Sequence, residues 1–600
     1  MSYQGTCKRL GLLEGDQHWE NTLSDAVVSE TATKLRELFT IILIFCQPSD
    51  PFELWSKFRN DLCEDILNRI RNDNQDITLE YNDDIYNEGL IIIEDKIHEM
   101  CDKSLTDFGL PASNRNNSNS NMDALEAALR KPYDLNKSSE YISENEPKLV
   151  NDQLKAYNCV LNSVRVNEGK IFFLDAPGGT GKTFVTNLIL AKVRSQGKLA
   201  LAVASSGIAA TLLAGGRTAH STFKLPLTVS LHKDSVCSIR KNGPLGKILQ
   251  DVSLIIWDEC TMIHRAHVEA LDRTLRDIRS SNKVMGGITV MFAGDFRQTL
   301  PVIVRGTRAD IVKSCLKTSP MWKFVHTLKL STNMRAHLGG GSTNFPSKLL
   351  LIGDGKIPHF ENKIEIDHDL GEKVTSIEDL ISKVYPDVDQ IENKDYQWMC
   401  QRAILAARNS SVDEINDIIL RKLPGNKVNY ISIDNVMDQE DAVHYPQEFL
   451  NSLNPSGLPP DSLKLKTGTP IILLRNLKPP NLCNGTRLQV KLLRNNVIIA
   501  IVLTGPAVGQ TVLIPRIPMI PNDLPFNFKR IQFPVKVSFA VTINKAQGQT
   551  FKHVGIDLRQ DCFTHGQLYV ALSISGCEEN QYVLLPQENK TKNIVYTEVL

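Results

Sequence analysis

Short apolar runs alternate with helix-patterned segments from about residue 148 onwards. The clearest runs are 171–174, 199–204, 254–257 and 288–293, and polar or glycine-rich stretches follow them. Apolar runs of this length between helices are typical of strands buried on both faces of a parallel sheet. The pattern therefore predicts an α/β fold in which helices flank a parallel sheet.

The first part of the chain, residues 1–110, has a different pattern. Leucine and isoleucine recur at helical spacing in 33–45 and again in 90–100, and Pro51 is placed to open a further helix. Nothing in this stretch suggests chemistry, and acidic pairs such as Asp83-Asp84 are typical of solvated helix faces. We therefore expect a mainly α-helical N-terminal region that serves as a scaffold or an interaction domain.

Between these two parts the composition changes. Residues 111–122 are rich in asparagine and serine, and a polar, weakly patterned stretch continues to about residue 147. Such a composition cannot bury a core and is typical of a linker. We therefore predict a flexible linker over 111–147.

Composition limits the classes of protein further. The chain has 600 residues, enough for three to five domains, and a formal net charge of +0, so nucleic-acid binding would have to rest on a local groove. Its 12 cysteines form no Cys-x-x-Cys pair, which argues against a zinc site and a disulfide scaffold. The apolar stretch 38–46 is too short to span a bilayer, and no secretory signal pattern opens the chain. We expect no membrane partner.

The stretch 176–183, APGGTGKT, lies between an apolar run and a helix-patterned segment. A strand, a glycine loop and a helix in this order are typical of a phosphate-binding loop. Lys182 is expected to reach the β- and γ-phosphates of a nucleotide, and the Thr183 hydroxyl to hold magnesium. The alternative, a glycine-rich turn with a chance lysine, is disfavoured by the motifs that follow. The backbone cradle for the phosphates would be formed by Gly178, Gly179, Thr180 and Gly181.

Two adjacent carboxylates, Asp258 and Glu259, end the apolar run 254–257. Unpaired buried charge is costly, so such a pair at the end of a buried strand indicates a functional site. Asp258 is expected to hold magnesium, directly or through water, and Glu259 to orient and polarise the attacking water.

Three further side chains have weaker signals. Gln298 follows the run 288–293 and is placed to sense the γ-phosphate. Arg335 is placed to act as an arginine finger in cis. Gln153 precedes a helix that leads to the phosphate loop. A glutamine at this position is able to read adenine through a paired donor and acceptor. The alternative for each residue alone is an ordinary surface side chain.

The loops after the run 199–204 are rich in small and hydroxylated residues. They lie where a doubly wound sheet opens at its strand ends, so a phosphodiester strand is able to cross them. Ser206 would bind the backbone of that strand, and His220 or Phe223 would offer a stacking face. The alternative for Ser206 is ordinary helix capping.

Together these motifs resemble those of the superfamily 1 DNA helicases of the Pif/RecD group, in particular the PIF-type helicases of Helitron-like transposons. The resemblance covers about 146–590, and the segment LGLLEGD at 10–16 resembles the stretch before the helicase in Helitron-like proteins. No paired-histidine nuclease motif is visible. The motifs are APGGTGKT (176–183), SSGIAATLLAGGRTAHSTF (205–223), LIIWDE (254–259), GDFRQTLP (294–301), LSTNMR (330–335), LLLIGDGKIP (349–358), AILAARNSSVDEIN (403–416), LKLKTGTPIILLRNL (463–477), NGTRL (484–488), TINKAQGQT (542–550) and HGQLYVALS (565–573).

The resemblance implies a fold and an activity. It implies an α/β protein with two RecA-like P-loop NTPase domains, over 148–329 and 330–600, and a small β-rich insertion at about 421–534. It further implies ATP and Mg²⁺ as cofactors, and 5′ to 3′ movement along single-stranded or forked DNA. Lys545 joins the candidates for DNA contact on the same ground. We expect the chain in the nucleus, with the cytoplasm as the alternative, since no targeting signal is readable.

One position departs from the family pattern. Ile574 stands where the last motif normally has an arginine that approaches the γ-phosphate. The main hypothesis is an active helicase in recombination, repair, telomere maintenance or Helitron-type transposition, among which the motifs do not choose. The alternative is a protein that binds ATP and DNA but hydrolyses poorly. A nucleotide kinase or signalling ATPase would not need the motifs of the second half.

Overall fold

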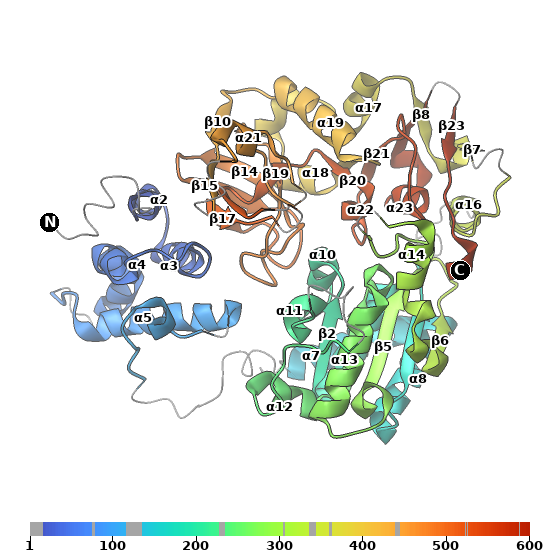
Figure 1. Ribbon diagram of the computed structural model, residues 1–600, viewed down its shortest axis with the longest axis horizontal. Helices are drawn as coiled ribbons and strands as arrows, with labels where there is room; N and C mark the ends of the chain where they lie inside the picture. Colours follow the sequence, from blue (N-terminus) through green and yellow to red (C-terminus); the bar gives the residue numbers. More distant parts are fainter. Residues whose placement is uncertain are drawn as a thin grey trace.

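The computed structural model describes residues 16–600 with several gaps. The residues not described are 1–15, 75–77, 102, 116–134, 227–233, 304–305, 335–343, 359–362, 438–443, 456, 522–523, 525 and 587–588. Within the described part the chain forms an N-terminal helical region, two α/β units and a β-rich insertion (Figure 1).

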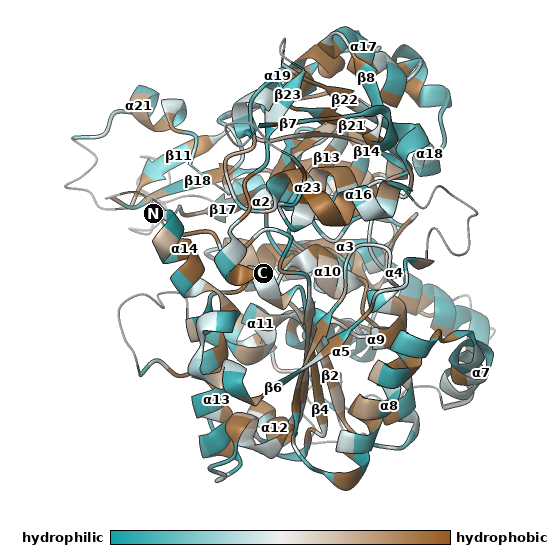
Figure 2. Ribbon diagram, turned by 90° about the vertical axis from the view of Figure 1, so that its right-hand side faces the viewer, coloured by the Kyte–Doolittle hydropathy of each residue, from teal (hydrophilic) through white to brown (hydrophobic). Residues whose placement is uncertain are grey.

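The first α/β unit is built on a parallel sheet with the strand order β3-β2-β4-β5-β1-β6. Successive residues of β1 point to opposite faces, so Phe172 packs in one core and Phe173 in the other. Both faces therefore need helices, and Figure 2 shows the hydrophobic strands β2 and β4 between them. The strands are β1 (Ile171–Asp175), β2 (Ala200–Ala204), β3 (Arg217–Thr218), β4 (Leu254–Asp258), β5 (Thr289–Gly294) and β6 (Val325–Lys329). The helices are α8 (Asn151–Val166), α9 (Lys182–Ser195), α10 (Gly207–Thr211), α11 (Ala219–Phe223), α12 (Pro244–Asp251), α13 (Arg265–Ile278) and α14 (Arg308–Ser314).

The second α/β unit has a parallel sheet with the order β20-β9-β21-β22-β8. Two buried clusters again cover its two faces. The strands are β8 (Glu372–Val374), β9 (Arg402–Ala406), β20 (Ala540–Thr542), β21 (His553–Asp557) and β22 (Gln581–Leu584), and a separate antiparallel pair is formed by β7 (Lys363–Glu365) and β23 (Lys590–Lys592). The helices are α16 (Asn344–Gly353), α17 (Ile377–Val384), α18 (Tyr396–Cys400), α19 (Asn409–Lys422), α22 (Ile543–Ala546) and α23 (Gln567–Ser573).

The insertion interrupts the second unit between α19 and β20 and is antiparallel throughout its described strand pairs. Its sheets have the orders β16-β15-β14-β13-β19, β11-β18-β17 and β10-β12. Its elements are β10 (Val428–Ile431), β11 (Ile433–Val436), α21 (Gln447–Ser452), β12 (Ser462–Leu465), β13 (Pro470–Leu473), β14 (Arg487–Leu493), β15 (Val497–Val502), β16 (Thr511–Pro515), β17 (Ile517–Met519), β18 (Phe528–Gln532) and β19 (Val535–Val537).

The N-terminal helical region packs on this insertion. Its helices are α2 (Gln17–Val27), α3 (Ala32–Ile41), α4 (Pro51–Asn74) and α5 (Asp83–Met100). Their apolar core includes Val497, Ile499, Leu513 and Ile531 of the insertion. An ion pair of 2.5 Å between Lys478 and Glu37 joins the same two parts.

The predicted fold class is therefore confirmed: two parallel α/β units, an antiparallel β-rich insertion and a helical N-terminal region. The linker prediction for 111–147 does not hold over α7 (Leu135–Asn145), which packs against α9. Within the part of α7 whose side chains are described, Ile142 is 7% exposed and joins the core of the first unit, which accounts for this packing. Among the described residues, no helix is both long enough and apolar enough to cross a membrane.

Candidate functional site

The phosphate loop lies where β1 ends and α9 begins, at the carboxyl edge of the first sheet. Gly179 and Gly181 adopt φ values of 84° and 81°, a region that side chains disfavour. A Cβ on Gly181 would lie 2.6 Å from Nε2 of Gln153, so this position also excludes a side chain on packing grounds. The Thr180 hydroxyl donates to the Pro177 carbonyl at 2.8 Å and closes the loop on itself. The loop is thus built around the start of α9, where helix N–H groups favour anions.

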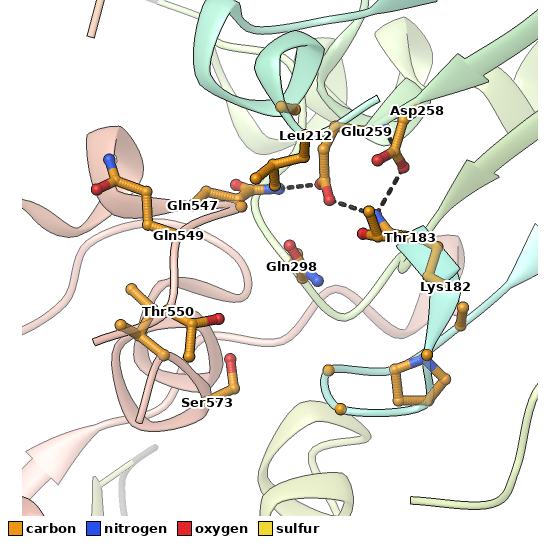
Figure 3. Close-up of a pocket in the computed structure, with 18 of the residues that line it drawn as sticks. Lys182, Thr183, Leu212, Asp258, Glu259, Gln298, Gln547, Gln549, Thr550 and Ser573 are labelled. Atoms are coloured by element: carbon orange, nitrogen blue, oxygen red, sulfur yellow. Dashed lines mark hydrogen bonds and ion pairs between the residues drawn. The ribbon is translucent and has the colours of Figure 1, made fainter. Parts of the chain in front are cut away.

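Lys182, the first residue of α9, lies between the two predicted acids (Figure 3). Its Nζ is 2.8 Å from Oδ1 of Asp258 and also donates to Oε1 of Glu259. Burial alone would lower the pKa of Lys182, but the two carboxylates outweigh it and raise that pKa. Burial raises the pKa of Asp258, and Lys182 partly offsets this. The lysine is thus ion-paired with both buried acids, and its single charge offsets one of their two until a phosphate competes for it.

The acids follow β4, and Glu259 has a φ of 49°, an uncommon left-handed backbone for a non-glycine residue. Its backbone N–H donates to Oδ1 of Asp258 at 2.8 Å. Both carboxylates are almost completely buried, with exposed fractions of 2% for Asp258 and 4% for Glu259. Strained backbone of this kind is often concentrated at functional sites.

A cleft of about 630 Å³ contains these groups. Thr183 and Gln298 line it from the first unit, and Gln547, Gln549, Thr550 and Ser573 line it from the second. Figure 3 shows Gln547 reaching towards Glu259. The volume and the loop geometry suit a nucleoside triphosphate bound between the units.

The predicted magnesium ligands, Thr183 and Asp258, both line this cleft. No group of three or more His, Cys, Asp or Glu side chains able to hold a metal occurs among the described residues. A hydroxyl and one carboxylate nevertheless fit Mg²⁺, which usually completes its octahedron with waters and substrate phosphates. The residues present therefore fit this ion when a nucleotide brings its phosphates.

Gln153 is buried and bridges the loop to its own helix. Its Nε2 donates to the Thr180 carbonyl at 3.0 Å, and its Oε1 accepts from the Val150 N–H at 3.3 Å. In this structure the amide therefore supports the phosphate loop. Its contact with adenine remains a prediction.

Two positions bear on whether an arginine reaches the γ-phosphate, namely Arg335 and Ile574. Arg335 lies outside the described residues, so its predicted finger role remains a prediction. Ile574 lines the nucleotide cleft and is 4% exposed. Lys182 is thus the cationic side chain that the described residues place in the lining of this cleft.

A second cleft, of about 360 Å³, lies beside the first and will be called the strand cleft. It brings together Ser206, His220 and Lys545, three of the four predicted DNA contacts. Burial lowers the pKa of His220, which favours the neutral ring. Desolvation and the charge of Lys536 lower the pKa of Lys545. The Ser206 hydroxyl also accepts from the Ala209 N–H at 3.1 Å, so the capping alternative holds alongside the position in the cleft.

Phe223, the fourth predicted contact, does not line the strand cleft. Its side chain is 0% exposed and packs against Trp257, with ring centroids 5.8 Å apart. The prediction of a stacking face at Phe223 is therefore wrong in this structure. The short helix α11 directs the phenylalanine into the core and leaves His220 at the cleft.

Sequence reasoning missed several amide side chains that the fold brings to these clefts. Gln547 lines both clefts, and Asn476, Asn484 and Asn544 line the strand cleft. The motifs TINKAQGQT and NGTRL contain or begin at three of these four residues. The available signal was the position of these amides within the quoted motifs.

Comparisons with known proteins agree with this geometry. Residues 148–363 match the PIF1-like helicase family, and residues 448–493 match the 2B domain of DNA helicase Pif1. The chain is similar to the ATP-dependent DNA helicase Pif1 of Campylobacter jejuni, with 27% identity over 423 residues that cover 67% of this chain and 86% of that protein. It is also 27% identical over 318 residues to the Psychrobacter Pif1 helicase, covering 53% of this chain and 44% of that one.

Solved structures share the fold. The Pif1 helicase from Candida albicans superposes with a TM-score of 0.53 at 23% identity, over 75% of this chain and 98% of that chain. The Bacteroides Pif1 helicase in complex with ADP-AlF3 and ssDNA superposes with a TM-score of 0.52 at 22% identity. The superposition covers 71% of this chain and 91% of that chain.

Proposed function

We propose that this chain is a Pif1-like superfamily 1 helicase, an ATP-dependent DNA helicase that moves 5′ to 3′ along single-stranded DNA. The observation that carries the proposal is the contact of Lys182 with Asp258 and Glu259 in a cleft that the second unit closes. The strand cleft beside it supplies a path for the nucleic acid.

In the proposed reaction, Lys182 leaves the acids and binds the β- and γ-phosphates of ATP. Glu259, freed from the lysine, orients a water for attack on the γ-phosphate, and Gln298 senses the loss of that phosphate. Thr183 and Asp258 would hold Mg²⁺, which when bound would supply positive charge against the charge that develops on the phosphates. Because the two units together line the nucleotide cleft, binding and release of nucleotide change the distance between their DNA-binding surfaces.

The nucleic acids bound by related proteins indicate the substrate. The Bacteroides structure described above holds ssDNA, and another solved Pif1 structure describes unwinding at forked dsDNA. We therefore propose single-stranded and forked DNA as partners of this chain. Membership of the Helitron-like subgroup is a finer proposal, supported by the motifs at 10–16 and 205–223. Sequencing of the genomic locus tests this proposal. A replication-initiator nuclease gene beside the gene of this chain would support it, and a locus without transposon ends would contradict it.

The biological process and location belong to the proposal as well. Recombination, repair, telomere maintenance and transposition all require DNA in the nucleus, so a nuclear site follows from each of them in a eukaryotic cell. Imaging a tagged full chain tests this: nuclear signal is expected, and exclusive cytoplasmic signal contradicts it.

Strand separation tests the function directly. Partial duplexes with a 5′ tail, a 3′ tail or a fork are mixed with the chain, ATP and Mg²⁺. We expect unwinding of the forked and 5′-tailed duplexes and none of the 3′-tailed one. Unwinding only from the 3′ tail contradicts the direction, and no unwinding with normal ATP binding favours the alternative that Ile574 suggests, a DNA clamp with impaired hydrolysis.

A further inference from the structure

Gln547 is the side chain that lines both the nucleotide cleft and the strand cleft. It follows α22 of the second unit and is 4% exposed. Its neighbours Asn544 and Lys545, on α22 itself, line only the strand cleft. A movement of this short helix therefore moves Gln547.

The amide of Gln547 is hydrogen-bonded at both ends to the first unit. Its Nε2 donates to Oε2 of Glu259 at 3.0 Å. Its Oε1 accepts from the hydroxyl of Thr299, in the loop that follows β5. Thr299 thus fixes which end of the amide faces Glu259. Figure 3 shows this amide pointing from the second unit towards the carboxylate.

The two oxygens of Glu259 have different partners: Lys182 binds Oε1, and Gln547 binds Oε2. When a phosphate takes Lys182, the amide of Gln547 still holds the carboxylate. Oε1 then faces the cleft in a fixed direction. A carboxylate that orients a water needs such a fixed direction, because small misplacements of reacting groups are costly.

The opposite wall of the strand cleft is tied to the acids. Ser205 accepts a hydrogen bond of 3.0 Å from Nε1 of Trp257, the residue before Asp258, and its N–H donates to the Asp258 carbonyl at 3.1 Å. This wall therefore cannot move relative to β4 without breaking these bonds. A change in the width of the strand cleft appears instead at α22, and so at the bond between Gln547 and Glu259.

We propose that Gln547 is a positioning residue that holds Glu259 for hydrolysis and makes this hold depend on a single strand in the strand cleft. A strand bridging Ser206 and His220 to Asn544 and Lys545 keeps α22 against the first unit. Gln547 then remains on Glu259 and turnover is fast. Without a strand, α22 moves away and the carboxylate is no longer oriented. The inference rests on the proposed function, since it assumes that strand binding stimulates ATP hydrolysis.

The test is steady-state ATP hydrolysis with and without saturating oligothymidylate, for the full chain and for Gln547→Ala. We expect stimulated kcat to fall by at least ~10-fold, with the KM for ATP and the oligothymidylate concentration for half-stimulation each within ~3-fold of wild type, because only the transition-state geometry is lost. The ratio of stimulated to basal turnover should fall as well, because the inference places the loss in the response to the strand. The matched control is Gln401→Ala, an exposed glutamine of the second unit.

Two further variants separate positioning from a merely structural role. Thr299→Val should lose part of the same stimulation, and the double variant with Gln547→Ala should be no worse than Gln547→Ala alone. Gln547→Glu keeps the shape but cannot donate when ionised beside Glu259, Asp258 and Lys182. Its stimulated turnover relative to wild type should therefore rise as the pH falls and the new carboxyl becomes protonated.

Unchanged stimulated kcat in Gln547→Ala overturns the inference, as does a loss that appears only in the KM or in the half-stimulation concentration. Additive losses in the double variant also overturn it. So does a stimulated turnover of Gln547→Glu, relative to wild type, that does not change with pH. If the wild-type chain itself shows no stimulation by oligothymidylate, the proposed function fails, and the inference fails with it.

Discussion

At the scale of single residues, the site is a balance of buried charge. Lys182 is ion-paired with two carboxylates that are almost completely buried. Removing one partner of a buried ion pair leaves charge without compensation and commonly costs about 3–5 kcal/mol. The arrangement therefore has two roles: it stabilises the empty site, and it holds the lysine next to the place where phosphate is expected.

Lys182→Ala tests the second role. The variant should lose ATP-dependent unwinding while it retains binding of single-stranded DNA, because the strand cleft does not include this residue. Fluorescence anisotropy with a labelled oligonucleotide and an unwinding assay measure the two properties. Full unwinding by the variant would remove the phosphate loop from the mechanism.

Glu259→Gln separates binding from hydrolysis. The amide keeps the shape of the carboxylate but cannot polarise water, so we expect ATP to bind while kcat falls by at least ~10²-fold. Rapid-quench kinetics with a nucleotide-binding assay measure both. Glu372→Gln, at an exposed acid paired with Lys383, is the control and should leave kcat unchanged. Unchanged kcat in Glu259→Gln would exclude the assigned role.

Ile574→Arg tests the departure from the family pattern. An arginine at this position would direct a positive charge into the nucleotide cleft, where an arginine finger is worth ~10³–10⁵ in turnover in related chemistry. We expect kcat to rise by at least ~10-fold. An unchanged kcat would show that another group already supplies this charge.

At the scale of elements, the phosphate loop depends on left-handed glycines. Gly181→Ala combines an unfavourable φ with a Cβ that would lie 2.6 Å from Gln153, so we expect a loss of about 2 kcal/mol in the free energy of unfolding and a raised KM for ATP. Gly197→Ala is the matched control: its φ is 71°, and nothing lies within 4 Å of the added carbon. This control should lose about 1 kcal/mol and keep its KM. Equal effects in the two variants would contradict the packing argument.

The sequence predicted the positions of helices and strands well, but it predicted the tertiary contacts between them much less well. The runs 171–174 and 254–257 predicted β1 and β4, because apolar strands flanked by polar loops have few alternatives. Local pattern did not tell His220 from Phe223, since the direction of a side chain on α11 depends on the core beneath it. Gln547 was not predicted because its partners, Glu259 and Thr299, meet it only when two units distant in sequence pack together.

At the scale of the whole molecule, the N-terminal helical region and the insertion form one buried core. Leu513 of β16 contributes to this core, and Glu37 of α3 is paired with both Lys478 and Lys96. The pKa of Glu37 is lowered, because these two lysines outweigh the opposing effect of burial. We therefore expect the two parts to move together, so that a movement of the insertion carries the helical region with it.

Leu513→Ala tests this connection. We expect a loss of about 2–4 kcal/mol in the free energy of unfolding, since the leucine is 5% exposed. Hydrogen exchange should become faster in α3 as well as in β16. The control is Leu492→Ala, at an exposed leucine of the same insertion. Faster exchange in β16 alone would contradict a shared core.

The central claim is that ATP hydrolysis in the first cleft responds to a strand in the second. Its most direct test is the steady-state rate of ATP hydrolysis by the full chain, measured with and without single-stranded DNA at saturating ATP and Mg²⁺. The account predicts that DNA increases kcat by at least ~10-fold, because the strand holds the two units together around Glu259. A rate that is the same with and without DNA would contradict it.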